Sequence, residues 1–275
     1  MLLGIVFCLI PPLIWGGMFP VANHLAPTVN MFAMTFIRYA SVAIILVLML
    51  VLAEGLRAFR LEGKGWKLFL LGSAGFAGFG TSAFVALGYT IAAILIAFFG
   101  VSLALTNGNY EHLVSPRDAL GGILALMGAI CWVVYTRGAA ATPGWSALRY
   151  TSITTALSLP TILLANIVAT AVGYIETPTP VAVLAGWPVL TYLAIPAGLI
   201  AVLAWNQGNQ ILGPLNGTLF MNLVPITTFT IMAIVTGTLP TAAAMVGALL
   251  VIAGLLINNL FTRRAMKKAA PARQA

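Results

Sequence analysis

Four carboxamide side chains close together near the end of an apolar segment form the most distinctive chemical pattern of the sequence. The stretch reads Trp205-Asn206-Gln207-Gly208-Asn209-Gln210. Each amide offers both an acceptor and donors, so these side chains could hold the ammonium and the carboxylate of a zwitterion without a fixed charge. The alternative is that the amides cap a helix where it meets the aqueous surface.

Arg38 is the only charge well inside an apolar segment. A charge within a membrane span is costly, and by default it marks a binding or pairing role. Two interpretations of Arg38 stay open: it binds substrate, or its guanidinium bonds carbonyl groups near a helix end. The five acidic residues cannot pair with it inside a span, because they lie at segment ends or in loops. They are Glu54, Glu62, Glu111, Asp118 and Glu176.

Aromatic residues inside the apolar segments are candidates to line a cavity. Trp15, Tyr89, Trp132 and Tyr135 offer ring faces that suit apolar, aromatic or cationic solutes. The alternative is that they belong to the aromatic belts at the membrane surfaces. Belt positions are predicted for the tryptophans beside loops, which are Trp66, Trp145 and Trp187.

Prolines inside two segments are candidate kink or gating points. Pro20 lies in the first segment, and Pro225 follows Asn222 by three residues in a later one. A proline leaves a backbone carbonyl without its helical partner, so Asn222 and that carbonyl could bind substrate or accompany a bend.

The composition requires lipid around most of the surface. Of 275 residues, 61% are hydrophobic and 7% are charged, whereas soluble domains carry about 25% charged residues. The net charge of +8 comes from basic residues beside apolar segments, which is typical of cytoplasmic loops rather than of nucleic-acid binding. The basic tail 263–273 is expected to meet anionic lipid head groups.

Patterns of metal, disulfide and enzyme chemistry are missing from the sequence. Cys8 and Cys131 lie in apolar runs and are predicted to pack as small buried residues. Two cysteines are too few for a disulfide framework or a zinc site. His24, predicted to be a polar residue at a helix end, and His112 are the only histidines, and no catalytic motif accompanies them. We therefore expect no cofactor, no metal and no enzymatic activity.

Nine apolar segments predict an all-α integral membrane protein, since a span needs about 20 apolar residues. The segment at the N-terminus is too long for a signal peptide and is expected to be retained as a span. The segments are 2–22, 31–53, 67–90, 91–106, 118–136, 150–172, 189–206, 216–237 and 240–261.

A weak internal repeat relates the two halves of the chain. Trp15 matches Trp132, and Arg38-Tyr39 is matched with Arg149-Tyr150. Because the two tryptophans are related by the repeat, we expect them to face each other across its axis.

The spacing of later matches in this repeat indicates that one helix is missing. Gly88 and Gly208 lie 120 residues apart, but Gly100 and Gly254 lie 154 apart. The difference is enough for one helix and a loop, and the junction between Thr90 and Ile91 is where the first half lacks it. The alternative is one long helix over 67–106, but its forty residues would span about 60 Å, twice the hydrocarbon thickness of a bilayer. We predict ten helices in two inverted five-helix repeats, at 1–106 and 118–262, followed by a cytoplasmic tail at 263–275.

Charge supports this topology. With the N-terminus inside and a tenth span restored, 11 of the 13 basic residues face the cytoplasm, as the positive-inside rule requires. Both termini are then cytoplasmic, and five-helix halves insert with opposite orientation, which is a common plan of secondary transporters. The predicted location is a bacterial-type inner membrane.

A set of residues spread along the chain carries a resemblance to a known family: Ile14-Trp15-Gly16, Pro27, Arg38-Tyr39, Pro225, Gly247 and Gly254. With them the chain resembles the drug/metabolite transporter superfamily in its ten-helix form with two EamA-type halves. The resemblance covers essentially the whole chain. It departs at Thr236-Gly237-Thr238, where the family often has a glutamate after the glycine.

The resemblance implies a basket of helices around a cavity that opens alternately to each side. Within the superfamily, the chain is most similar to bacterial exporters of aromatic amino acids and related metabolites. We expect a monomeric secondary transporter of amino acids, aromatic ones favoured. Without an embedded acid, transport is expected to be facilitative. The alternatives are a carrier of drugs, organic cations or other metabolites with the same fold, and more distantly a membrane enzyme.

Overall fold

The structure of the chain is a computed structural model. It describes residues 1–78 and 116–237, together with single positions between 242 and 257. In that part of the chain every regular element is helical, and no strand occurs. This agrees with the predicted all-α class.

The order of the helical elements follows the chain from α1 to α12. The first half contains α1 (Leu2–Leu25), α2 (Met31–Glu54), the 3₁₀ turn η1 (Leu56–Phe59), α3 (Gly65–Gly72) and the π-helical turn η2 (Ser73–Ala77). The second begins with α6 (Pro116–Gly138), η3 (Ala139–Ala141) and α7 (Ala147–Ala171). It continues with α8 (Pro180–Ala185), α9 (Trp187–Ala194), the π-helical turn η4 (Ile195–Ile200), α10 (Ala201–Leu212), α11 (Pro214–Gly217), η5 (Thr218–Asn222) and α12 (Leu223–Thr236).

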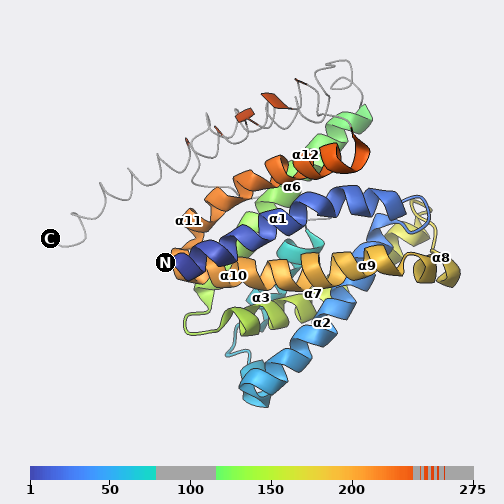
Figure 1. The fold of residues 1–275 in the computed structure, drawn as a ribbon. Coiled ribbons are helices and arrows are strands. Elements are labelled where there is room, and N and C mark those ends of the chain that lie inside the picture. The colour runs from blue at the N-terminus through green and yellow to red at the C-terminus, as the bar shows by residue number, and fades with distance from the viewer. Residues whose placement is uncertain are drawn as a thin grey trace.

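Five described helical segments are long and apolar enough to cross a membrane, and each matches a predicted span. They are Leu2–Ala22, Met31–Glu54, Ala147–Ala171, Trp187–Leu212 and Pro214–Val235. The fourth span is built from α9, η4 and α10, which follow one another along one line (Figure 1). The predicted segment 91–106, the junction between Thr90 and Ile91 and the tail 263–275 lie outside the described residues.

Helices of the two halves pack against each other. α1 contacts α10 and α12, while α2 contacts α7 and α9 (Figure 1). Glycines allow the closest approaches, as expected where apolar packing gains little from lipid. A Cβ on Gly72 would lie 2.1 Å from the backbone oxygen of Thr154 in α7, and a Cβ on Gly208 would lie 2.5 Å from the Cys8 sulfur in α1.

The starts of α2 and α7 correct one feature of the predicted repeat. Asn30 and Ser146 are the N-cap residues, and their side chains accept hydrogen bonds from the backbone N–H groups of Ala33 and Arg149. Matching these two caps places Arg38 opposite Thr154. The match of Arg38-Tyr39 with Arg149-Tyr150 is therefore wrong, because the two arginines stand at different depths after their caps.

The π-helical turns η2 and η4 stand at corresponding places in the two halves. Each directly follows an eight-residue α-helix, α3 before η2 and α9 before η4. A π turn shifts the backbone hydrogen-bond register by one residue, and such turns are frequent at functional sites. In η2, the N–H of Gly78 bonds the carbonyl of Ser73, and in η4 that of Ala201 bonds Pro196.

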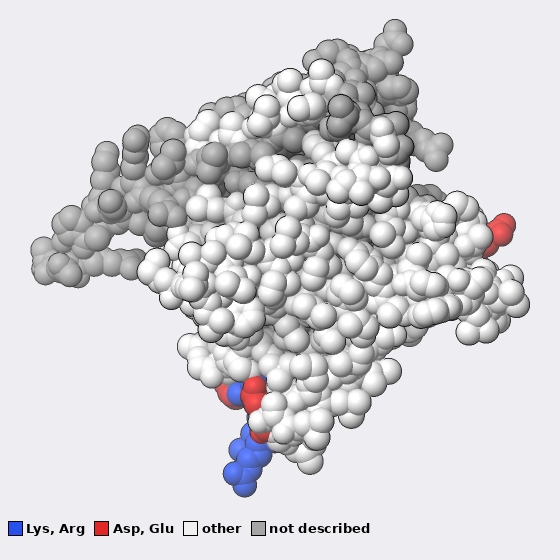
Figure 2. All heavy atoms as spheres, in the orientation of Figure 1, with Lys and Arg blue, Asp and Glu red and all other residues white. Residues whose placement is uncertain are grey.

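The bundle has two distinguishable ends. We call the "26–30 end" the one where α1 joins α2. The loop 172–179 lies there too, because the Asn30 side chain donates to the Glu176 carbonyl at 2.7 Å. The "55–64 end" holds the α2–α3 loop and the start of α7. Figure 2 shows charged atoms gathered where α2 ends, one acidic group near α8, and uncharged surface between them. A surface of this kind suits lipid.

Candidate functional site

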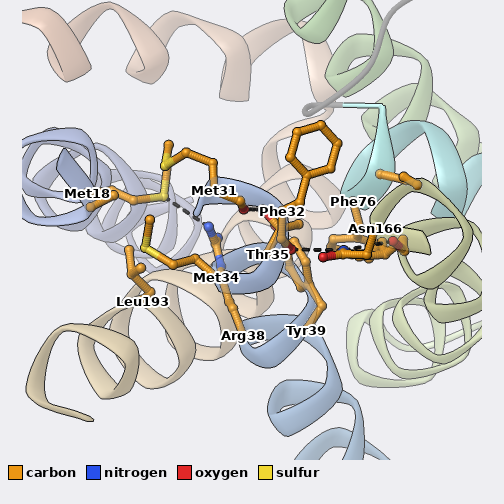
Figure 3. A pocket seen from close by; sticks show the side chains of 14 residues that line it. Met18, Met31, Phe32, Met34, Thr35, Arg38, Tyr39, Phe76, Asn166 and Leu193 are labelled. Carbon is orange, nitrogen blue, oxygen red and sulfur yellow. Dashed lines mark hydrogen bonds between the residues drawn. The ribbon is translucent and has the colours of Figure 1, made fainter. Parts of the chain in front are cut away.

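A cavity of about 290 Å³ lies between α1, α2, η2, α7 and α9, in the half of the bundle nearer the 26–30 end. Met31, at the start of α2, lines it and is 46% exposed, so the cavity reaches the surface there. Figure 3 shows Arg38 and Asn166 on different sides of the space.

One face of α2 supplies much of the lining. Met31, Met34, Thr35 and Arg38 recur at three- and four-residue intervals, the spacing that places side chains on one side of an α-helix. Met18 of α1 and Leu193 of α9 complete the wall beside them. Methionine side chains are flexible and polarizable, so this wall can adapt to different apolar groups.

Three aromatic rings form another part of the lining. They belong to Phe32, Tyr39 and Phe76. The Tyr39 and Phe76 rings meet edge to face with centroids 4.9 Å apart, a favourable arrangement for aromatic pairs. Phe76 lies in η2 and is 1% exposed, so the π-helical turn forms a fixed part of the cavity floor.

Among the described residues of the lining, Arg38 is the charged one. Its Nη1 lies 3.2 Å from the Met18 sulfur and its Nη2 donates to the Ala197 carbonyl in η4 at 3.3 Å. Its guanidinium carbon lies 4.6 Å from the centre of the Tyr39 ring. Nε is buried and has no hydrogen-bond partner. The guanidinium therefore meets neutral groups alone.

Two uncharged polar side chains also line the cavity. Thr35 donates its hydroxyl hydrogen to the Met31 carbonyl at 2.7 Å. Asn166 donates its amide hydrogens to the carbonyls of Phe32 and Ile162, both at 3.0 Å. Because the donors of both side chains are bonded to backbone carbonyls, the side-chain oxygens of Thr35 and Asn166 can still accept hydrogen bonds from a solute.

A layer of three tryptophans lies deeper in the bundle, toward the 55–64 end. The Trp15 ring meets Trp132 edge to face with centroids 5.3 Å apart, and Trp205 lies 6.0 Å from Trp15 and 6.3 Å from Trp132. The expected meeting of Trp15 and Trp132 is thus observed. Trp15 Nε1 donates to the Ala197 carbonyl at 2.9 Å, and Trp205 Nε1 donates to Thr136 at 3.0 Å.

A buried polar cluster stands beside this tryptophan layer. The Asn206 amide donates to the Tyr135 hydroxyl and to Thr151 Oγ1, both at 2.7 Å. The Tyr150 hydroxyl donates to the Tyr135 carbonyl at 2.7 Å. All four residues are nearly or fully buried. The hydrogen bonds of this cluster join α6, α7 and α10, while Asn206 Oδ1 is buried without a hydrogen-bond partner.

The predicted site residues therefore separate into two groups. Arg38 lines the cavity, whereas Trp15, Trp132, Tyr135, Trp205, Asn206 and Asn209 pack beneath it. Asn206 bonds neighbouring helices rather than capping a helix end, and Asn209 donates to the Trp205 carbonyl of its own helix at 2.7 Å. Pro20 lies inside an uninterrupted α1. Tyr89 and the side chains of Asn222 and Pro225 lie outside the described part of the chain.

Several cavity residues were not predicted from the sequence. Met31, Met34 and Thr35 could have been found from Arg38, because they precede it by seven, four and three residues on one helix face. Met18, Asn166 and Leu193 come from other helices and carry no comparable signal. Ordinary apolar or amide residues stand out only once the helices are placed together.

Arg149 holds the 55–64 loop against the start of α7. Its Nε donates to the Ala58 carbonyl at 2.7 Å, and its Nη2 donates to the Arg60 carbonyl at 2.6 Å and to Glu62 Oε1 at 2.9 Å. Lys64 also pairs with Glu62 at 3.1 Å. The ion pairs seen among the described residues gather at this end.

The predicted belt position of Trp145 is wrong. Its side chain is 6% exposed, whereas Trp66 and Trp187 are 72% and 65% exposed, as belt residues should be. The Arg149 guanidinium covers the Trp145 ring at 3.7 Å, and Trp145 Nε1 donates to Glu62 at 3.1 Å. Stacking under an arginine with a bonded indole N–H satisfies the ring inside the protein.

Replacing Glu62 by glutamine is expected to increase hydrogen exchange of the 55–64 backbone several-fold at pH 7. Hydrogen bonds from Lys64, Arg149 and Trp145 lower the pKa of Glu62 below its ordinary value of 4.5. The stabilisation by this carboxylate is therefore fully present above pH 4.5 and is lost as the pH falls through the lowered pKa.

Hydrogen exchange of the wild type and of Glu62→Gln checks this expectation. The wild-type loop should stay protected from pH 7 to pH 5, and Glu176→Gln, at the other end, should leave it unchanged. Equal exchange rates of the 55–64 backbone in wild type and Glu62→Gln would contradict the stabilisation of this loop by the Glu62 carboxylate.

Three comparisons with known proteins agree with this architecture. The EamA-like transporter family matches residues 119–260. The "Uncharacterized transporter YrdR" of Bacillus subtilis (strain 168) is 36% identical over 95% of this chain and 92% of its own length. The "Uncharacterized transporter YyaM" of the same organism is 26% identical over 80% of this chain and 81% of its own length.

The likeness extends to a solved fold. A crystal structure of a protein with 18% sequence identity superposes with a TM-score of 0.59 and covers 95% of this chain and 98% of that chain. At this identity the match concerns the fold alone. The chain is a multi-pass membrane transporter that belongs to the EamA-like transporter family, within the drug/metabolite transporter superfamily.

Proposed function

We propose that the protein is a secondary transporter that moves amino acids, aromatic ones favoured, or related small metabolites by alternating access. One observation carries the proposal. The cavity at Arg38 reaches the surface near the 26–30 end, while the tryptophan layer and the buried Asn206 cluster fill the bundle beneath it. A carrier open to one side and packed on the other has this arrangement.

The aromatic part of the cargo is supported by the cavity walls. Phe32, Tyr39 and Phe76 offer ring faces and edges, and the methionines beside them adapt to apolar shapes. The volume of about 290 Å³ stands near the lower limit of ligand pockets, which run from about 300 Å³. It suits a solute with one ring or a short chain.

In this proposal the protein lies in the bacterial inner membrane with both termini in the cytoplasm, and acts as a monomer. Arg57, Arg60, Lys67 and Arg149 lie at the 55–64 end, and the positive-inside rule places such an end in the cytoplasm. α1 ends at the opposite end, so its start then faces the cytoplasm too. The cavity would open away from the cytoplasm. The basic tail 263–273 would meet anionic lipids there.

The proposed ten-helix plan, with halves at 1–106 and 118–262, places one further helix at the junction of Thr90 and Ile91. The YrdR alignment supports it. That alignment extends over 300 residues, more than the 275 of this chain. YrdR therefore has residues that align with gaps in this chain. A membrane span needs about 20 residues, so these extra residues are enough for one helix.

Counterflow in proteoliposomes tests the proposed function. Vesicles loaded with unlabelled phenylalanine should accumulate labelled phenylalanine transiently and saturably, and vesicles without protein should not. Because no carboxylate lines the described cavity, transport in this proposal is facilitative, and an imposed pH gradient should leave the rate unchanged. Flux that rises without saturation would contradict a carrier and favour a channel.

A further inference from the structure

The geometry points to Arg38 as an anion subsite, and we propose that the cavity accepts an organic carboxylate with an apolar body and rejects organic cations. The inference names the substrate class of the proposed transporter. That the bound carboxylate is also transported rests on the proposed function, whereas binding itself does not. The argument for binding depends on the guanidinium, the lining and the distribution of acids in the structure.

The guanidinium of Arg38 has more donors than partners. Arginine carries five N–H donors in a planar fork. At Arg38 they meet the Met18 sulfur and the Ala197 carbonyl, and Nε meets no acceptor. Thioether sulfur is a weak acceptor, and the carbonyl contact of 3.3 Å is long. A carboxylate with two oxygens matches this unused fork bidentately.

None of the acids whose side chains are described, which are Glu54, Glu62 and Glu176, pairs with this charge. All interactions of Arg38 in the structure are with neutral groups. Glu62 forms ion pairs with Arg149 and Lys64, and Glu54 accepts a hydrogen bond from Ser146. Both acids lie at the 55–64 end, away from the cavity. The positive charge is therefore free to act on a ligand. It attracts an anionic group and repels a cation that carries no carboxylate to offset its charge.

The rest of the lining favours an apolar body on that anion. Methionine, phenylalanine and aliphatic side chains line the space around the guanidinium, so a bound ligand with an apolar body would displace water there and strengthen the interaction of its carboxylate with Arg38. The acceptor oxygens of Asn166 and Thr35 could additionally take the N–H groups of an amino acid. They are not needed for a carboxylate that lacks an amine.

Binding to the purified full-length protein in detergent tests the subsite. Three probes share one phenyl ring: L-phenylalanine, 3-phenylpropionate and phenethylamine. The two carboxylates are expected to quench tryptophan fluorescence saturably and to raise the melting temperature, and phenethylamine is not. Arg38→Gln should weaken binding of both carboxylates by about 30-fold or more, as for loss of a desolvated charge pair. Arg38→Lys keeps the charge but not the planar set of N–H donors, so its dissociation constants should lie between those of the wild type and of Arg38→Gln.

Arg57→Gln is the matched control, because Arg57 is exposed at the other end of α2; it should leave the dissociation constants unchanged. Wild-type protein that binds neither carboxylate, or binds phenethylamine as tightly, would overturn the subsite even where Arg38→Gln does not fold. Equal binding by wild type and Arg38→Gln would do the same. Carboxylate binding without counterflow would instead overturn the carrier and leave the subsite. Counterflow of phenethylamine alone would overturn the subsite and leave the carrier.

Discussion

Replacing Trp205 by alanine is expected to lower the free energy of unfolding by about 3–5 kcal/mol, the range measured for buried large-to-alanine changes. Trp205 is fully buried, and its ring lies 6.0 Å from Trp15 and 6.3 Å from Trp132. Removing it leaves a void between three helices and deprives Thr136 of its indole donor. In a membrane bundle the loss is mainly one of packing contacts.

Unfolding of purified protein in detergent, followed by circular dichroism, measures this change. Trp187→Ala is the control of the same chemistry, because Trp187 is 65% exposed; it should change stability by less than about 0.5 kcal/mol. Trp205→Phe keeps a ring but not the donor to Thr136, and should cost about 1–3 kcal/mol. Similar losses for Trp205→Ala and Trp187→Ala would mean that the tryptophan layer does not pack as described.

Replacing Gly72 by alanine is expected to destabilise the protein by about 3 kcal/mol, the upper part of the range for overpacking. The added Cβ would lie 2.1 Å from the Thr154 carbonyl oxygen and 2.9 Å from its carbon. Both atoms belong to the backbone of α7, so no side-chain rotation relieves the clash. α3 and α7 must separate instead, which disturbs η2 and the cavity floor.

The control for this prediction is Gly65→Ala. A Cβ at Gly65 would meet only the end of the Leu61 side chain, at 3.1 Å, which can move. Alanine also favours a helix over glycine by up to about 1 kcal/mol, so Gly65→Ala should be neutral or slightly stabilising. Thermal unfolding in detergent compares the two variants, and a Gly72→Ala protein as stable as the wild type would refute the close crossing.

The spans were predictable from the sequence because the thickness of a bilayer fixes the length of an apolar helix. The spans predicted at 2–22 and 31–53 agree with the structure to within a residue at each end, and that at 216–237 to within two. The meeting of Trp15 and Trp132 followed from the repeat. Both successes depend on signals that are continuous along the chain or repeated in it.

The cavity was not predictable in the same way, because lipid-facing and core-facing residues are equally apolar. The sequence singled out the amides after Trp205, yet Asn206 and Asn209 are packed inside the bundle. It singled out Arg38 by its charge, but not Met18 or Asn166, which depend on how α1 and α7 are placed beside α2. Trp145 was misplaced because nothing local indicates that Arg149 covers its ring.

The backbone oxygen of Ala197 connects the cavity with the tryptophan layer. This single acceptor takes hydrogen bonds from Trp15 at 2.9 Å and from Arg38 at 3.3 Å. A ligand that binds the Arg38 guanidinium and draws it away from Ala197 leaves that oxygen to Trp15 alone. Ligand binding in the cavity would therefore alter the hydrogen bonding of the tryptophan layer. Because the oxygen lies within a π-helical turn, the exchange takes place where the hydrogen-bond register of the span is already displaced.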